Sequence, residues 1–161
     1  MCCENQQEAL NDLIQAIYDN DSEYVRAHVG HIQNLDAIGI KGNNPLTRAI
    51  NDDDIEIVQL LLAHGVNLNL NIEAYGGATP LHLAISRAED AYQIDLQENN
   101  YADGVQADLT LVRYLLGHHP NLNLKNSRGE TVSKWFSGWK ELHDLIEAER
   151  QWQIDNNYQH K

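Results

Sequence analysis

Apolar residues recur along this chain with the three- and four-residue spacing of one face of a helix. In the first such segment, Leu10, Leu13, Ile14 and Ile17 share a face, and a shorter helical segment follows over 22–29. A further helical segment of this kind follows over 55–64, where the core side chains are Ile57, Val58, Leu60, Leu61 and Leu62. The pattern predicts an all-α chain that is built from repeated helical hairpins.

A constant spacing relates these hairpins to one another. Ala16 lies 33 residues before Ala49, and Val112 lies 33 residues before Leu145. Two extra residues precede the third repeat, and 19 more lie inside it. The spacing predicts one domain over 1–161, with repeats at about 4–35, 36–68, 69–122 and 123–154, an insertion over 88–107 and a frayed tail over 155–161.

The most informative motif lies in the third repeat, where residues 77–84 read Gly-Ala-Thr-Pro-Leu-His-Leu-Ala. Thr79 suits the N-cap of a helix, and Pro80 suits its first position because that position needs no backbone donor. We expect His82 to hydrogen-bond to Thr79 and nearby backbone, rather than to bind a metal or act in catalysis. The second repeat carries the same motif with Asn44 as the cap and Thr47 in the place of the histidine.

The motif Gly-x-Thr-Pro-Leu-His-x-Ala and the 33-residue period resemble those of the ankyrin-repeat family. The resemblance implies a solenoid of about four helix-turn-helix repeats that acts as a protein-binding module. The outer repeats lack the intact motif, as expected of capping repeats. Family contacts usually come from the projecting turns and the exposed side of the first helices. By position these are Ile40, Lys41, Asn43, Asn51 and Asp52 in the second repeat, Tyr75, Ala78, Ser86 and Arg87 in the third, and Ser127, Arg128 and Glu130 in the fourth.

The insertion in the third repeat departs from the family pattern. Residues 88–108 include six Asp or Glu and no Lys or Arg, and the segment is expected to form a long loop. Because it also carries apolar and aromatic side chains, we favour a binding role. The predicted contacts there are Tyr92, Asp95, Glu98, Tyr101 and Asp103. Two alternatives remain: a disordered loop beside a concave face that binds alone, and a longer first helix pinned by the apolar residues.

Other polar residues at equivalent positions favour structural roles. Asp21, Asp54, Asp108 and Glu141 each precede a second helix, where capping is expected. His31, His64 and His118 fall at the ends of second helices and are too widely spaced to share one zinc ion. Trp135, Trp139 and Trp152 are expected to seal the end of the stack. We therefore predict no catalytic residue, no metal site and no cofactor; an enzyme that uses the histidines is the alternative.

Charge and cysteine content narrow the choice of partner. The formal net charge is −13, which disfavours nucleic acid and anionic membranes and favours a basic protein, although acidity also aids solubility. The chain has no apolar run long enough to span a bilayer, no recognisable export signal and only the adjacent Cys2 and Cys3, so we expect a cytoplasmic location. Lipidation of the cysteine pair is an alternative.

These observations together predict a non-enzymatic interaction module that is monomeric when free. We expect an inhibitor or immunity-type protein that binds a basic partner such as a toxin, by electrostatic complementarity. The alternative is a scaffold or effector that recruits a host or regulatory protein.

Overall fold

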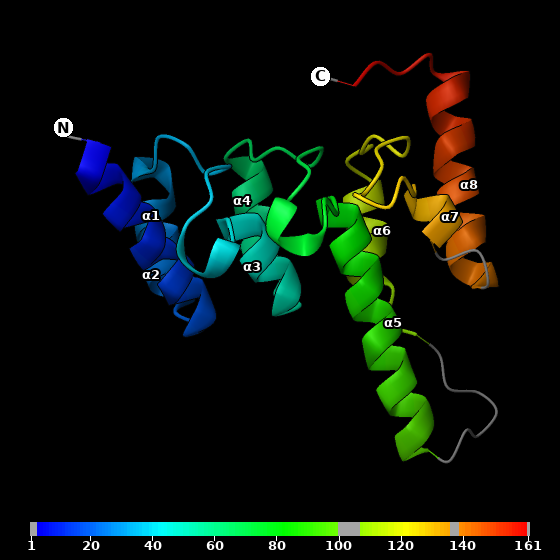
Figure 1. Ribbon diagram of the computed structural model, residues 1–161, viewed down its shortest axis with the longest axis horizontal. Helices are drawn as coiled ribbons and strands as arrows, with labels where there is room; N and C mark the ends of the chain where they lie inside the picture. Colours follow the sequence, from blue (N-terminus) through cyan, green and yellow to red (C-terminus); the bar gives the residue numbers. More distant parts are fainter. Residues whose placement is uncertain (1–2, 100–106, 136–138, 161) are drawn as a thin grey trace. The chain divides into compact units, whose positions relative to one another are not determined.

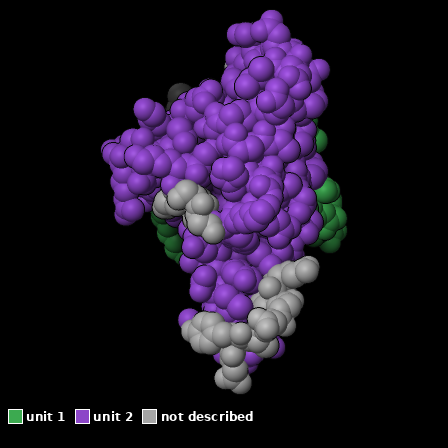
Figure 2. Space-filling view, turned by 90° about the vertical axis from the view of Figure 1, so that its right-hand side faces the viewer, with its two compact units in different colours: residues 1–70 green, residues 71–161 purple. Residues whose placement is uncertain are grey.

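The computed structural model describes residues 3–99, 107–135 and 139–160, and the chain divides into two compact units. The N-terminal unit comprises residues 1–70 and the C-terminal unit residues 71–161, as coloured in Figure 2. The single domain expected over 1–161 stays a prediction, and each unit is treated by itself below. Within the described ranges the chain is helical, with one isolated antiparallel bridge between Ile72 and Ala78.

The N-terminal unit contains the first two helical hairpins (Figure 1). Its elements are α1 (Cys3–Tyr18), α2 (Ser22–His28), η1 (Val29–His31), η2 (Ile40–Gly42), α3 (Pro45–Asn51) and α4 (Ile55–Ala63). Helix α1 packs against α2 and α3, and α3 packs against α4. The predicted apolar face of α1 is buried in this core, which confirms the helical periodicity read from the sequence.

The C-terminal unit contains the third and fourth hairpins. Its elements are η3 (Glu73–Tyr75), α5 (Pro80–Glu98), α6 (Thr110–Leu116), α7 (Val132–Trp135) and α8 (Lys140–Asp155). Helix α5 packs against α6, and α6 packs against α8. Ile85, Leu115 and Leu142 lie in the core between these helices.

The two predicted motif helices begin as the sequence indicated. Asn44 accepts a hydrogen bond from the Thr47 amide at 2.8 Å, and the Thr47 hydroxyl accepts one from the Asn44 amide at 3.0 Å. Thr79 and His82 form the same reciprocal capping box at the start of α5. Thr47 therefore replaces the histidine in its capping role, and the structural role expected of His82 is confirmed.

Two of the four predicted capping acids fill that role. Asp21 caps α2 and Asp54 caps α4. The prediction was wrong for Asp108, because α6 begins only at Thr110 and the Asp108 carboxylate holds the preceding turn by accepting from the Thr110 amide at 2.8 Å. It was also wrong for Glu141, which lies inside the first turn of α8 and pairs with Arg113 at 2.8 Å.

Of the three histidines that were expected to interact with the end of a second helix, His64 and His118 do so through a backbone carbonyl of the last turn. The Nδ1 atom of His64 lies 2.8 Å from the Leu60 carbonyl oxygen, and that of His118 lies 3.0 Å from the Tyr114 carbonyl. In the first repeat His28, rather than His31, makes this contact, to Tyr24. The described residues include no group of three potential metal ligands close enough to hold an ion.

The acidic insertion is not a loop over its first half. Helix α5 continues without a break to Glu98, so residues 88–98 lengthen the first helix of the third repeat. No Gly or Pro interrupts the chain between Pro80 and Glu98, and the helix can therefore continue past the repeat. The alternative of a longer first helix holds for this part, while Tyr101 and Asp103 lie outside the described residues.

Aromatic side chains join the last helix to its surroundings. Trp152 stacks on His119, with ring centroids 3.7 Å apart, and Tyr158 in the predicted tail contacts both rings. Trp139 instead stacks on Tyr92 of α5. The side chain of Trp135 lies outside the described part of the chain.

Candidate protein-binding surface

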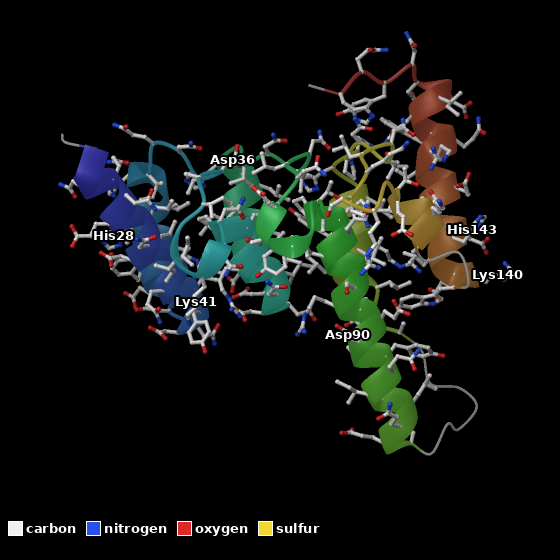
Figure 3. The ribbon with its side chains drawn as sticks, in the orientation of Figure 1. His28, Asp36, Lys41, Asp90, Lys140 and His143 are labelled. Carbon is white, nitrogen blue, oxygen red and sulfur yellow. The ribbon has the colours of Figure 1, made fainter. Side chains whose placement is uncertain are left out.

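The turn of the second repeat is tied to the first helix. The Asn11 side chain accepts a hydrogen bond from the Ile40 amide at 3.0 Å, and the Gly39 amide donates to the Asn43 carbonyl at 2.7 Å. Lys41 at the tip has a positive φ of 55° and is exposed. The turn therefore presents Lys41, labelled in Figure 3, from a fixed backbone.

Two cations of this unit converge on one aromatic ring. The Lys41 Nζ atom lies 4.2 Å from the Tyr18 ring centroid, and the Arg48 guanidinium lies 4.8 Å from it. Arg48 also donates to Asp52, whose Oδ2 atom is 2.6 Å from Nε. Because the Tyr18 side chain is 51% exposed, this cluster offers an aromatic contact that the sequence analysis did not single out.

An open groove of about 660 Å³ adjoins Tyr18 in the same unit. Its acidic lining residues are Asp52, Asp53, Asp54 and Glu56. Asp52 pairs with Arg48, Asp54 caps α4 and Glu56 pairs with Arg26. Asp53 also makes an interaction. The groove gives this edge of the surface a negative character.

The turns of the third and fourth repeats are hydrogen-bonded to each other. The Ser127 amide donates to the Gly76 carbonyl at 2.8 Å. The Asn71 side-chain amide donates to the Gly77 and Lys125 carbonyls at 2.6 and 2.9 Å. In the C-terminal unit, the two tips therefore form one connected edge.

The side chains of His82 and Asn126 contact the backbone of the fourth-repeat turn in this edge. The Asn126 Oδ1 atom accepts from the Arg128 and Glu130 amides at 2.9 and 3.0 Å. His82 is buried, with Nδ1 beside the Thr79 hydroxyl at 2.8 Å and Nε2 3.3 Å from the Glu130 carbonyl. Burial lowers the pKa of His82, against the opposing effect of the hydrogen bond to that carbonyl. The neutral imidazole with its proton on Nε2 fits both contacts.

The predicted turn and inner-helix contacts differ in exposure. Lys41, Asp52, Arg87, Ser127 and Arg128 are exposed, and Ile40, Asn51, Tyr75, Ser86 and Glu130 are partly exposed. Asn43 and Ala78 are buried, at 4% and 1% exposure, so these two side chains do not lie on the surface. Asn43 is turned toward Thr47, and Ala78 pairs with Ile72 in the isolated bridge.

The predicted contacts on the insertion fall on two sides of α5. Asp95 and Glu98 are exposed, whereas Tyr92 is partly buried against Trp139. Asp90, labelled on the distal half of α5 in Figure 3, is exposed with them, and so is Ile94. Ile94 was not a predicted contact, because residues 88–107 were expected to form a loop, in which side chains do not sort into faces. In a helix over 87–98, Ile94 lies opposite Tyr92.

The fold and the repeated motif place this chain in a known class. Residues 13–107 match the family model of ankyrin repeats in three copies. The chain therefore belongs to the ankyrin-repeat family, whose members present turns and inner helices to other proteins. Among the described residues, none of the helices combines the length and the apolar character needed to cross a membrane.

The chain is similar in sequence and in structure to Bcl-3 proteins. The B-cell lymphoma 3 protein homolog of Mus musculus is 36% identical over 81 residues, which make up 50% of this chain and 18% of that protein. The crystal structure of the ankyrin repeat domain of Bcl-3, described as a unique member of the IkappaB protein family, is similar with a TM-score of 0.60 and 27% identity. That match covers 84% of this chain and 50% of the other, so the chain spans no more than half the length of either relative.

Proposed function

We propose that this chain is a non-enzymatic protein-binding module that inhibits a partner with a basic surface, such as a toxin. The observation that carries the proposal is the distal half of α5, where Glu89, Asp90, Asp95 and Glu98 occur without any Lys or Arg over residues 88–98. Three of these four acids, Asp90, Asp95 and Glu98, are exposed. A helix with this charge attracts and orients a basic surface.

The hydrogen-bonded turns support the same proposal. Since Asn71, Asn126 and Ser127 already fix the tips of the C-terminal unit, little conformational entropy would be lost when a partner covers them. Preorganised turns of this kind suit a recognition surface better than a flexible one.

The net charge supports the choice of partner. At −13, the chain would repel nucleic acid and anionic membranes, and copies of it would repel one another. We therefore propose a basic protein as the partner and a monomeric free chain. A cytoplasmic location stays a prediction.

A second function is favoured by the likeness to the Bcl-3 proteins. The 36% identity to the mouse homolog supports an ankyrin scaffold or effector that recruits a host or regulatory protein. The two functions differ in what binding does: an inhibitor abolishes an activity of its purified partner, whereas a scaffold leaves that activity intact.

Affinity capture with charge-matched variants tests the proposal. The first variant, called the arm variant, removes the charges of the distal half of α5, residues 88–98. It carries Glu89→Gln, Asp90→Asn, Asp95→Asn and Glu98→Gln. The control variant removes the same charge from the N-terminal unit through Glu8→Gln, Asp12→Asn, Asp19→Asn and Glu23→Gln. We expect a basic protein to be retained by the parent chain and the control, and lost by the arm variant.

Two results would count against this function. Equal retention by both variants would remove the role of α5, and retention of an acidic protein would remove the electrostatic basis of the proposal. Adding the parent chain to the purified partner then decides between inhibition and recruitment.

A further inference from the structure

The distal half of α5 has one supported face. Tyr92 is partly buried and stacks on Trp139, with ring centroids 5.7 Å apart and an interplanar angle of 16°. Ala88 and Leu96, one turn before and one turn after Tyr92, are also partly buried. This side of the helix is therefore held by its own unit.

The opposite face is exposed along its whole length. Its residues follow the three- and four-residue spacing of one stripe. They are Arg87, Asp90, Ala91, Ile94 and Glu98, all of them exposed, while Asp95 is exposed at the border with the supported face. Figure 1 shows this half of α5 continuing past α6.

An aliphatic side chain lies at the centre of this stripe. Ile94 is 56% exposed, and carboxylates lie one helical turn away on each side, at Asp90 and Glu98. Asp95 follows Ile94 in the sequence, but it lies at the border with the supported face, three residues after Tyr92. The face thus combines a protruding apolar group with a rim of negative charge.

This combination defines the chemistry of a complementary surface. A pocket lined by apolar groups would remove Ile94 from water, and Lys or Arg side chains around that pocket would pair with the carboxylates. A uniformly basic surface without a pocket would leave Ile94 uncovered. The arrangement corresponds to the docking of an amphipathic helix into a groove.

We propose that Ile94 is the anchor by which α5 docks into an apolar pocket of the partner that is rimmed by basic side chains. Tyr92, a predicted contact, is instead a positioning residue that holds the helix through Trp139. This inference rests on the proposed function and specifies the part of the surface that recognises the partner.

The length of α5 suits this role. Helix α3, at the equivalent place in the second repeat, has 7 residues, whereas α5 has 19. The additional 12 residues extend the helix by about 18 Å. Because this extension is already helical, docking requires little further ordering.

The test measures binding of variants to the purified basic protein that the parent chain retains. We expect Ile94→Ala to weaken binding about tenfold or more, because it removes most of a buried aliphatic side chain. Ile94→Val should stay within about threefold of the parent. Ile154→Ala is the matched control, since Ile154 is an isoleucine on α8 with 65% exposure, and it should bind as the parent does.

A photo-crosslinking amino acid at position 94 supplies a second measurement. We expect it to join the chain to apolar residues of the partner that lie beside Lys or Arg. If Ile94→Ala binds as tightly as the parent, the inference is overturned while the proposed function stands. If the parent retains no basic protein, the proposed function fails, and the inference fails with it.

Discussion

A single buried histidine makes the stability of the connected turns in the C-terminal unit depend on pH. His82 connects the start of α5 to the turn of the fourth repeat through Thr79 and the Glu130 carbonyl. Burial holds the pKa of His82 below its ordinary value. The folded chain therefore binds this proton less readily than the unfolded chain does.

The sign of the resulting pH dependence follows from linkage. Well above pH of about 6.5 the imidazole is neutral in both states, and His82 adds no pH dependence. As the pH falls through about 6.5, the unfolded chain takes up the proton first, so the free energy of unfolding decreases. Urea unfolding from pH 8 to 5.5 should show this loss, and His82→Gln should remove part of the slope. An unchanged slope in that variant would contradict the assignment.

Gly77 is the second residue on which the edge depends. It has a φ of +69°, and a Cβ atom at this position would lie 3.0 Å from the Ser127 backbone nitrogen. Gly129 in the same unit has a φ of +74° and nothing within 4 Å of such an atom. The two glycines share the backbone constraint but differ in close contact.

Alanine substitutions separate these two effects. Gly129→Ala should lower the free energy of unfolding by about 1–2 kcal/mol, from the left-handed backbone alone. Gly77→Ala should lower it further, because the added methyl group pushes the two turns apart. Chemical denaturation measures both. Equal losses would show that the two turns accommodate the added methyl group without further cost.

At the scale of elements, α5 was the main difference between expectation and structure. The acidic segment was read as a loop because the family has a short turn at this place, yet residues 88–98 contain good helix formers and no breaker. The stack of Tyr92 on Trp139 and the partial burial of Ala88 and Leu96 show which side of the extended helix is supported. The local composition thus permits α5 to extend to Glu98, and a tertiary contact determines which side of the extended helix is buried.

Removing that stack should loosen the distal helix. Tyr92→Ala deletes a ring pair worth about 0.5–1.5 kcal/mol, so amides of residues 90–98 should exchange with solvent faster. Hydrogen exchange followed by mass spectrometry gives the measurement. Ile94→Ala is the control, because Ile94 is exposed and its loss should leave the exchange unchanged. Identical exchange in the two variants would argue against a bracing role for Tyr92.

At the scale of the whole molecule, we expect the net charge to control the rate of association with a partner. The net charge of −13 should attract a basic partner over distances that salt screens. We expect the association rate constant to fall about tenfold between low salt and about 0.15 M salt, with a smaller change in dissociation. Stopped-flow mixing with the captured partner measures both rates. Association that does not respond to salt would contradict electrostatic attraction.

The sequence by itself determined the all-α class, the repeat period and the two capped motif helices. These features depend on local physics: the spacing of apolar residues sets a helix face, and Asn44 or Thr79 satisfies free amides at a helix start. Thr47 stands in the second repeat where the motif has histidine, and this replacement is compatible with the same helix start. The capping box needs only a side-chain acceptor three residues after the cap.

The tertiary structure decided which side chains reach the surface. Asn43 and Ala78 lie in the projecting turns, yet other residues of the same chain bury their side chains. Ile94 and Tyr92 are two residues apart in a segment of one composition, yet the packing of Trp139 against one side leaves the other exposed. Burial depends on contacts between residues far apart in the sequence, and a local pattern does not specify those contacts.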